Sequence, residues 1–154
     1  MLIVEGKADV SAKDNNGSTP LHDAARGGHE ATARMLIVEG KADVSAVDDK
    51  DSTPLHYAAQ GGHEATARML IVEGKADVSA KDCDEETPLH YAAGRGHEAT
   101  ALMLIVEGKA DVSAKDNNGS TPLHDAAKKG HEAVVRTLIS HGAVVSSPTP
   151  STTP

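Results

Sequence analysis

The sequence predicts an all-α repeat fold, a solenoid of stacked helix-turn-helix units with projecting β-hairpin or loop tips. Two observations predict it. The tetrapeptide Thr-Pro-Leu-His recurs every 34 residues, and each copy opens an apolar segment of helical spacing that ends in glycine. Self-similarity with a period between about 20 and 50 residues is the signature of stacked repeats. The four copies stand at Thr19–His22, Thr53–His56, Thr87–His90 and Thr121–His124.

The period divides the chain into one repeat domain, 1–145, and a tail. Within the domain we place a partial repeat at 1–13 and full repeats at 14–47, 48–81, 82–115 and 116–145. The partial repeat is identical in sequence to 69–81 and has no first half. We therefore expect either end-to-end association of arrays, because the opening helix has no capping repeat, or a fragment of a longer array. The Ser/Thr/Pro-rich segment 146–154 is expected to be an extended tail.

The first helix of each unit is predicted from its cap and its apolar spacing. In unit one, Thr19 is suited to the N-cap and Pro20 to the first helical position, where a missing N–H costs nothing. Leu21, Ala24 and Ala25 have the spacing of one apolar helical face. The helix should end at the following glycine pair.

The second helix is predicted over about 30–38, with Ala33, Leu36 and Ile37 facing inward. A helix of about nine residues is too short to be stable alone in water, so it must pack against neighbours. The next segment, 43–48, leads into turn residues of the Asn-Asn-Gly type. This arrangement predicts a strand–turn–strand tip.

At this point the repeat resembles the ankyrin-repeat family. The motif is Asp-x-x-Gly-x-Thr-Pro-Leu-His-x-Ala-Ala-x-x-Gly-His, then a helix ending in glycine and an Ala-Asp-Val segment; 14–29 and 116–131 fit it in full. The resemblance covers roughly residues 1–145. It implies an ankyrin-like solenoid of antiparallel helix pairs, with tips at near right angles and a concave surface. It also implies protein binding without catalysis, and a structural role for the motif histidines.

Two departures from the family pattern predict local changes: an inserted residue should loosen or lengthen the outer loop after helix two, and a replaced turn glycine should cost stability. The period is 34 residues and the family usually has 33; the extra residue is Lys41, Lys75 or Lys109, after the glycine that ends helix two. The turn glycine is replaced by Asp51 in unit two and Glu85 in unit three. If that position needs a positive φ, each side chain costs about 1 kcal/mol.

Composition excludes several classes of function. The chain has two tyrosines, no Phe and no Trp, and a formal charge of −8. Single-stranded nucleic acid is bound by aromatic and basic side chains together, and anionic membranes attract basic segments, so neither partner is expected. No apolar run is long enough to span a membrane. The single cysteine forms no internal disulfide, which favours an intracellular, reducing compartment without identifying it.

The candidate binding surface consists of the positions that differ between units. These lie in the tips and first helices, whereas 30–46 and 64–80 are identical. Tyr57 and Tyr91 are one repeat apart and are surrounded by acids, which predicts a protein or peptide partner with basic residues. In the alternative interpretation the acids form a solvated face and the tyrosines fill grooves between repeats. The candidate partner-binding residues are Asp23, Asp49, Lys50, Tyr57, Gln60, Asp84, Glu86, Tyr91, Arg95, Asp125 and Lys128.

Residue patterns for catalysis, metals and cofactors are absent from the sequence. Eight of the nine histidines belong to the two repeated motifs, and none has the spacing of a zinc site. There is no phosphate-binding loop and no nucleophile elbow. Cys83 lies among acids that should raise its pKa, so it is not expected to be a nucleophile. Two functions remain: a protein-binding module, or a structural or engineered scaffold with no specific target.

Overall fold

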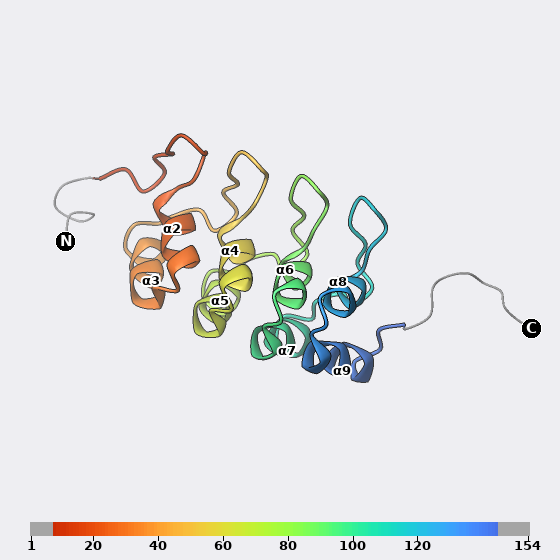
Figure 1. The fold of residues 1–154 in the computed structure, drawn as a ribbon. Helices are drawn as coiled ribbons and strands as arrows, with labels where there is room; N and C mark the ends of the chain where they lie inside the picture. Colours follow the sequence, from red (N-terminus) through yellow and green to blue (C-terminus); the bar gives the residue numbers. More distant parts are fainter. Residues whose placement is uncertain (1–7, 145–154) are drawn as a thin grey trace, which may run out of the picture.

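The computed structural model describes residues 8–144; the predictions for 1–7 and for the tail 146–154 lie outside this range. Within it, eight helices form four antiparallel pairs stacked in one direction, with a loop projecting from each pair (Figure 1). The all-α repeat prediction is confirmed. The helices are α2 (Pro20–Gly27), α3 (Glu30–Val38), α4 (Pro54–Gly61), α5 (Glu64–Val72), α6 (Pro88–Gly94), α7 (Glu98–Val106), α8 (Pro122–Lys128) and α9 (Glu132–Ser140).

The even-numbered helices form an inner row and the odd-numbered helices an outer row, each helix contacting the same helix of the next unit. Each inner helix begins with a capping box. In unit one the Thr19 hydroxyl accepts from the His22 backbone N–H, and the Thr19 N–H donates to the His22 ring at 3.0 Å. Because both backbone N–H groups have hydrogen-bond acceptors within the cap, a buried helix of eight residues can begin beside the tip.

The core consists of small aliphatic side chains, as the composition predicts. Leu21, Leu55, Leu89 and Leu104 are fully buried, with alanines between them. Alanine allows helix backbones to approach closely, so the units stack without aromatic residues in the core.

Buried histidines link each unit to the next. The second ring nitrogen, Nε2, of His22, His56 and His90 donates to a backbone carbonyl one unit on, at 2.8, 2.9 and 2.9 Å. The Gly-His histidines bond in the opposite direction, as in His97 Nε2 to the Gln60 carbonyl at 2.9 Å. The structural role expected of these motifs is therefore confirmed.

The projecting tips are loops, and the predicted strands are wrong for the described residues 8–144. Neighbouring tips share single backbone hydrogen bonds, such as Cys83 N–H to the Lys50 carbonyl at 2.9 Å. The Asp82 carboxylate instead accepts the N–H groups of Asp84 and Glu86 at 2.9 Å, and folds the tip on itself. Local side-chain hydrogen bonds of this kind compete with a strand ladder.

The positive φ considered for the replaced turn glycine is present, and the inserted lysine, expected only to loosen or lengthen its loop, also has a positive φ. Asp51 and Glu85 have φ of 61° and 63°, where units one and four have glycine. Lys75 has φ of 60°, and Lys41 and Lys109 are alike. The preceding Gly74 cannot take a side chain, because a Cβ there would lie 2.7 Å from the Leu70 carbonyl oxygen. The left-handed conformation is adopted by the inserted lysine and not by this glycine.

Candidate functional site

A groove of about 330 Å³ crosses the inner face between units two, three and four. Six of the candidate partner-binding residues line it: Gln60, Glu86, Tyr91, Arg95, Asp125 and Lys128. His90, Gly94 and Lys129 complete the lining. The sequence comparison therefore brought together residues that share one concave site, although they come from three repeats.

Five candidates lie outside this groove. Asp23, Asp49, Lys50 and Asp84 are exposed on the first helix of unit one or on the tips, and Tyr57 is half-buried beside unit one. Asp23 forms an ion pair with Arg26 at 2.9 Å, which is exposed and therefore weak. The carbonyls of Lys50 and Asp84 accept the backbone bonds between tips. Their side chains remain exposed to solvent.

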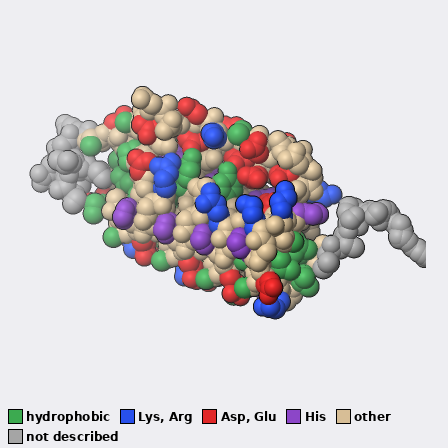
Figure 2. Space-filling model, viewed as in Figure 1, with side chains coloured by type: hydrophobic (Ala, Val, Ile, Leu, Met, Phe, Trp, Pro, Cys, Tyr) green, Lys and Arg blue, Asp and Glu red, His purple; other side chains and the backbone are tan. Residues whose placement is uncertain are grey.

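The lining of the groove carries charges of both signs. Its acidic lining residues are Glu86 and Asp125. Its basic lining residues are Arg95, Lys128 and Lys129. Figure 2 shows Lys and Arg side chains aligned beside a row of histidines across the units, with acidic side chains between that row and the tips. The groove therefore presents both acidic and basic side chains and is not uniformly acidic.

The two tyrosines have fixed internal partners. The Tyr57 hydroxyl donates to Asp48, and the Tyr91 hydroxyl donates to Asp82. The Tyr91 ring meets His56 edge-on, with centroids 5.3 Å apart. Burial and the adjacent Asp82 raise the pKa of Tyr91. Each tyrosine hydroxyl is thus engaged with the tip of its own unit, and of the two half-buried rings that of Tyr91 lines the groove.

Arg26 covers the ring of Tyr57, with the guanidinium carbon 4.3 Å from the ring centroid. Burial alone would raise the pKa of Asp48, but its hydrogen bonds from Tyr57, Ser52 and Lys50 lower that pKa overall. The ring of Tyr57 is therefore covered by a side chain of unit one, which the spacing of the two tyrosines did not predict.

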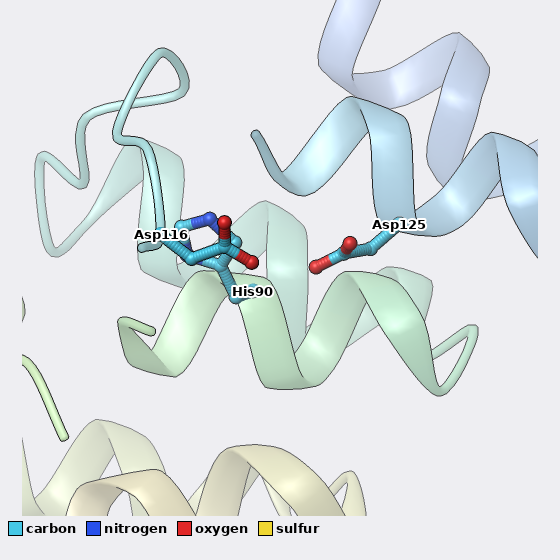
Figure 3. Close-up of side chains that lie close together, drawn as sticks. All are labelled: His90, Asp116 and Asp125. Carbon is cyan, nitrogen blue, oxygen red and sulfur yellow. The ribbon is translucent and has the colours of Figure 1, made fainter. Parts of the chain in front are cut away.

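Unit four replaces the tyrosine with Asp125. There His90, Asp116 and Asp125 come together with their polar atoms within 4.8 Å of one another (Figure 3). Burial raises the pKa of Asp125, and Asp116 adds to the effect. The sequence analysis missed this carboxyl pair, although Asp125 is two repeats beyond Tyr57 and one beyond Tyr91.

This cluster does not have a metal-binding donor set. The Nδ1 atom of His90 accepts from the Thr87 N–H at 3.1 Å, and its Nε2 donates to the Ser120 carbonyl at 2.9 Å. Both ring nitrogens are therefore occupied, and no lone pair is left for an ion. The remaining two carboxylates alone make a poor site.

Glu86 is a carboxyl of the groove whose pKa is strongly raised. Burial raises its pKa to about 7, and the nearby Asp82 and Asp125 contribute. Units one, two and four have serine at this position, namely Ser18, Ser52 and Ser120. Glu86 is thus an acid added to a position that does not require one for folding.

Cys83 lies at the tip of unit three and is exposed. Desolvation and the acids Asp84, Asp82 and Asp51 raise its pKa, in the direction that the sequence predicts. No helix in the described part of the chain is long and apolar enough to cross a membrane.

Comparison with known families is decisive for the fold. The family model for ankyrin repeats (3 copies) matches residues 1–82 and 72–149, which together cover most of the chain. The chain belongs to the ankyrin-repeat family. Ankyrin repeats are generally protein–protein interaction modules and are typically non-catalytic. No curated protein matched the ankyrin array of this chain.

Proposed function

We propose that this ankyrin array binds a protein or peptide whose basic side chains enter the concave groove of units two and three, where it meets unit four. The observation that carries the proposal is the groove itself, because Glu86 and Asp125 line it beside the ring of Tyr91. Carboxylates next to an aromatic ring suit the long stem and charged head of lysine or arginine.

The distribution of sequence differences supports the same surface. The second helices of units one and two are identical over 30–46 and 64–80, whereas tips and first helices differ. Residues that only hold the stack together have no reason to differ between equivalent positions. Unit three holds seven acids and three bases, a net charge of −4 out of −8. A basic partner would be attracted to this unit first.

The basic residues of the groove restrict the orientation in which a partner segment can bind. Arg95, Lys128 and Lys129 would repel a uniformly basic segment that filled the whole width of the groove. The partner segment therefore places its basic side chains toward Glu86 and Asp125. Its neutral or acidic groups then face the basic residues.

The test is a titration of the chain into a fluorescently labelled peptide of alternating lysine and serine, followed by anisotropy. The groove variant Asp125→Asn/Glu86→Ser should bind more weakly, and added salt should weaken binding by the parent. The control variant Glu39→Gln/Glu107→Gln removes the same charge from the ends of outer helices and should bind like the parent. Equal losses in both variants would indicate attraction to net charge alone and would reject the groove.

The alternative, a structural or engineered scaffold with no specific target, is supported by the internal hydrogen bonds of Tyr57 and Tyr91. In that case the tyrosines serve the tips alone. A parent chain that binds neither the lysine–serine peptide nor any protein tested would favour it.

End-to-end association is the second partner interaction that we propose. His124 is exposed, whereas His22 and His56 are buried against the following unit. Ile139 and Val144 are also exposed on this last unit, at 43% and 69%. Another copy could stack on this face as each unit stacks on the next. Light scattering that found a strict monomer at high concentration would contradict this.

A further inference from the structure

All four asparagines of the chain lie in two copies of one segment, Asp-Asn-Asn-Gly-Ser-Thr-Pro-Leu-His-Asp-Ala-Ala, at 14–25 and 116–127. Each copy holds an Asn-Gly pair at a tip: Asn16-Gly17 and Asn118-Gly119. Glycine lacks a Cβ, so its backbone nitrogen can approach the preceding side-chain amide closely. The chain therefore carries the same reactive pair twice, in two structural settings.

The first tip is held by the unit that follows it. The Asn16 carbonyl accepts a hydrogen bond from the Asp49 N–H at 3.0 Å. Gly17 is buried, and a Cβ placed on it would lie 2.6 Å from the Asp49 carboxylate. Opening this tip therefore requires breaking contacts between units one and two.

The second tip has no following unit among the described residues, and its bond to the preceding unit runs from the Asn117 N–H to the Asp84 carbonyl at 2.9 Å. Gly119 is exposed, and a Cβ placed on it would meet nothing within 4 Å. The Asn118 carbonyl accepts no backbone hydrogen bond within 8–144. The local bonds are otherwise equal, because Gly17 and Gly119 each donate to the aspartate carbonyl three residues earlier at 3.0 Å. Each tip thus has one backbone hydrogen bond to a neighbouring unit, but only at the first tip does the neighbour contact the Asn-Gly pair itself.

We propose that Asn118 is the site of spontaneous deamidation in this protein, and that Asn16 is protected by unit two. The Gly119 nitrogen attacks the side-chain carbonyl carbon of Asn118, and a nitrogen–carbon bond forms. The Gly119 amide proton passes to the leaving nitrogen, which departs as ammonia and leaves a cyclic imide. One water molecule then opens the imide to aspartate or isoaspartate.

The two products have different consequences for unit four. Aspartate at 118 corresponds to Asp84 of unit three and leaves the backbone unchanged. Isoaspartate adds a methylene to the main chain between Asp116 and Ser120. The Asp116 carboxylate accepts from both Asn118 and Ser120 at 2.9 Å, and Ser120 also accepts from His90. The iso form therefore loosens the junction between units three and four.

The chain offers a matched pair of peptides for the test. Cleavage after lysine and arginine releases 14–26 and 116–128, which differ only in ending at Arg26 or Lys128. After incubation of the intact chain at mildly alkaline pH, mass spectrometry measures the loss of ammonia at Asn16 and Asn118 in one sample. We expect Asn118 to react about five times faster, the ratio in local opening that one hydrogen bond made directly to the Asn-Gly pair produces.

Two controls decide the cause. In urea both asparagines should react at equal rates, because the sequence around them is the same. Gly119→Ala should slow the reaction at Asn118 and leave Asn16 unchanged. Equal rates in the folded chain, faster reaction at Asn16, or unequal rates in urea would overturn the proposal.

Discussion

The Tyr91 hydroxyl donates a hydrogen bond to Asp82, the residue that folds the tip of the same unit by accepting two of its backbone N–H groups. Tyr57 and Asp48 repeat the relationship in unit two. In unit four the partner of Asp116 is a second carboxyl, Asp125. Units two and three thus have tips supported by a tyrosine, whereas in unit four that bond is replaced by repulsion between two carboxyls.

Replacing Asp125 with tyrosine should therefore stabilise unit four. The new hydroxyl would bond Asp116, and the ring would meet His90 as Tyr91 meets His56. We expect a gain of about 1 kcal/mol in the free energy of unfolding. Asp125→Phe is the matched control, since it relieves the repulsion but cannot donate. The interpretation is wrong if tyrosine gives no more stability than phenylalanine in chemical denaturation.

The inserted lysines store backbone strain that glycine would remove. Lys75→Gly should raise the free energy of unfolding by about 1 kcal/mol, because φ at this position is 60°. Lys75→Ala removes the same side-chain atoms beyond Cβ and keeps the strain, so it should give no gain. Urea titration of both variants makes the comparison, and equal stabilities would rule out strain.

Glu86 should make stability depend on pH. Its pKa is raised from 4.5 to about 7, so its protonated form is favoured by folding and its ionisation costs stability as pH rises. Glu86→Ser should match the parent below about pH 4.5 and exceed it above pH 7. After allowance for solvent screening we expect about 1 kcal/mol. A serine variant whose advantage did not change with pH would contradict this.

Zinc should not stabilise the fold through the His90 cluster. Because both ring nitrogens of His90 are hydrogen-bonded, the cluster with Asp116 and Asp125 offers no histidine ligand. Treatment with EDTA, or addition of equimolar zinc, should leave the midpoint of thermal unfolding unchanged. A midpoint that rose with zinc and fell with EDTA would require a site with another donor arrangement.

Most of the fold could be predicted from the sequence because the repeat signals are local. The cap at Thr19, the end at Gly28 and the second helix over Glu30–Val38 each depend on a few adjacent residues. The strands were predicted wrongly for a physical reason. The Asp82 side chain satisfies backbone N–H groups that a strand ladder would otherwise have used.

The candidate site was only partly predictable. Comparison of equivalent positions identified Gln60, Glu86 and Arg95, which line one groove. It did not reveal that the hydroxyls of Tyr57 and Tyr91 are engaged within their own units, or that Asp125 faces Asp116. These are contacts between residues nine apart, across a tip whose shape depends on hydrogen bonds that sequence spacing does not show.

The location of binding can be measured residue by residue. Nitrogen-15 NMR spectra of the chain, recorded during titration with the lysine–serine peptide, report which backbone amides change their environment. The account predicts that the largest shifts occur at Gln60, Glu86, Tyr91 and Asp125, around the groove. Absence of shifts, or shifts centred on the outer helix ends at Glu39 and Glu107, would contradict it.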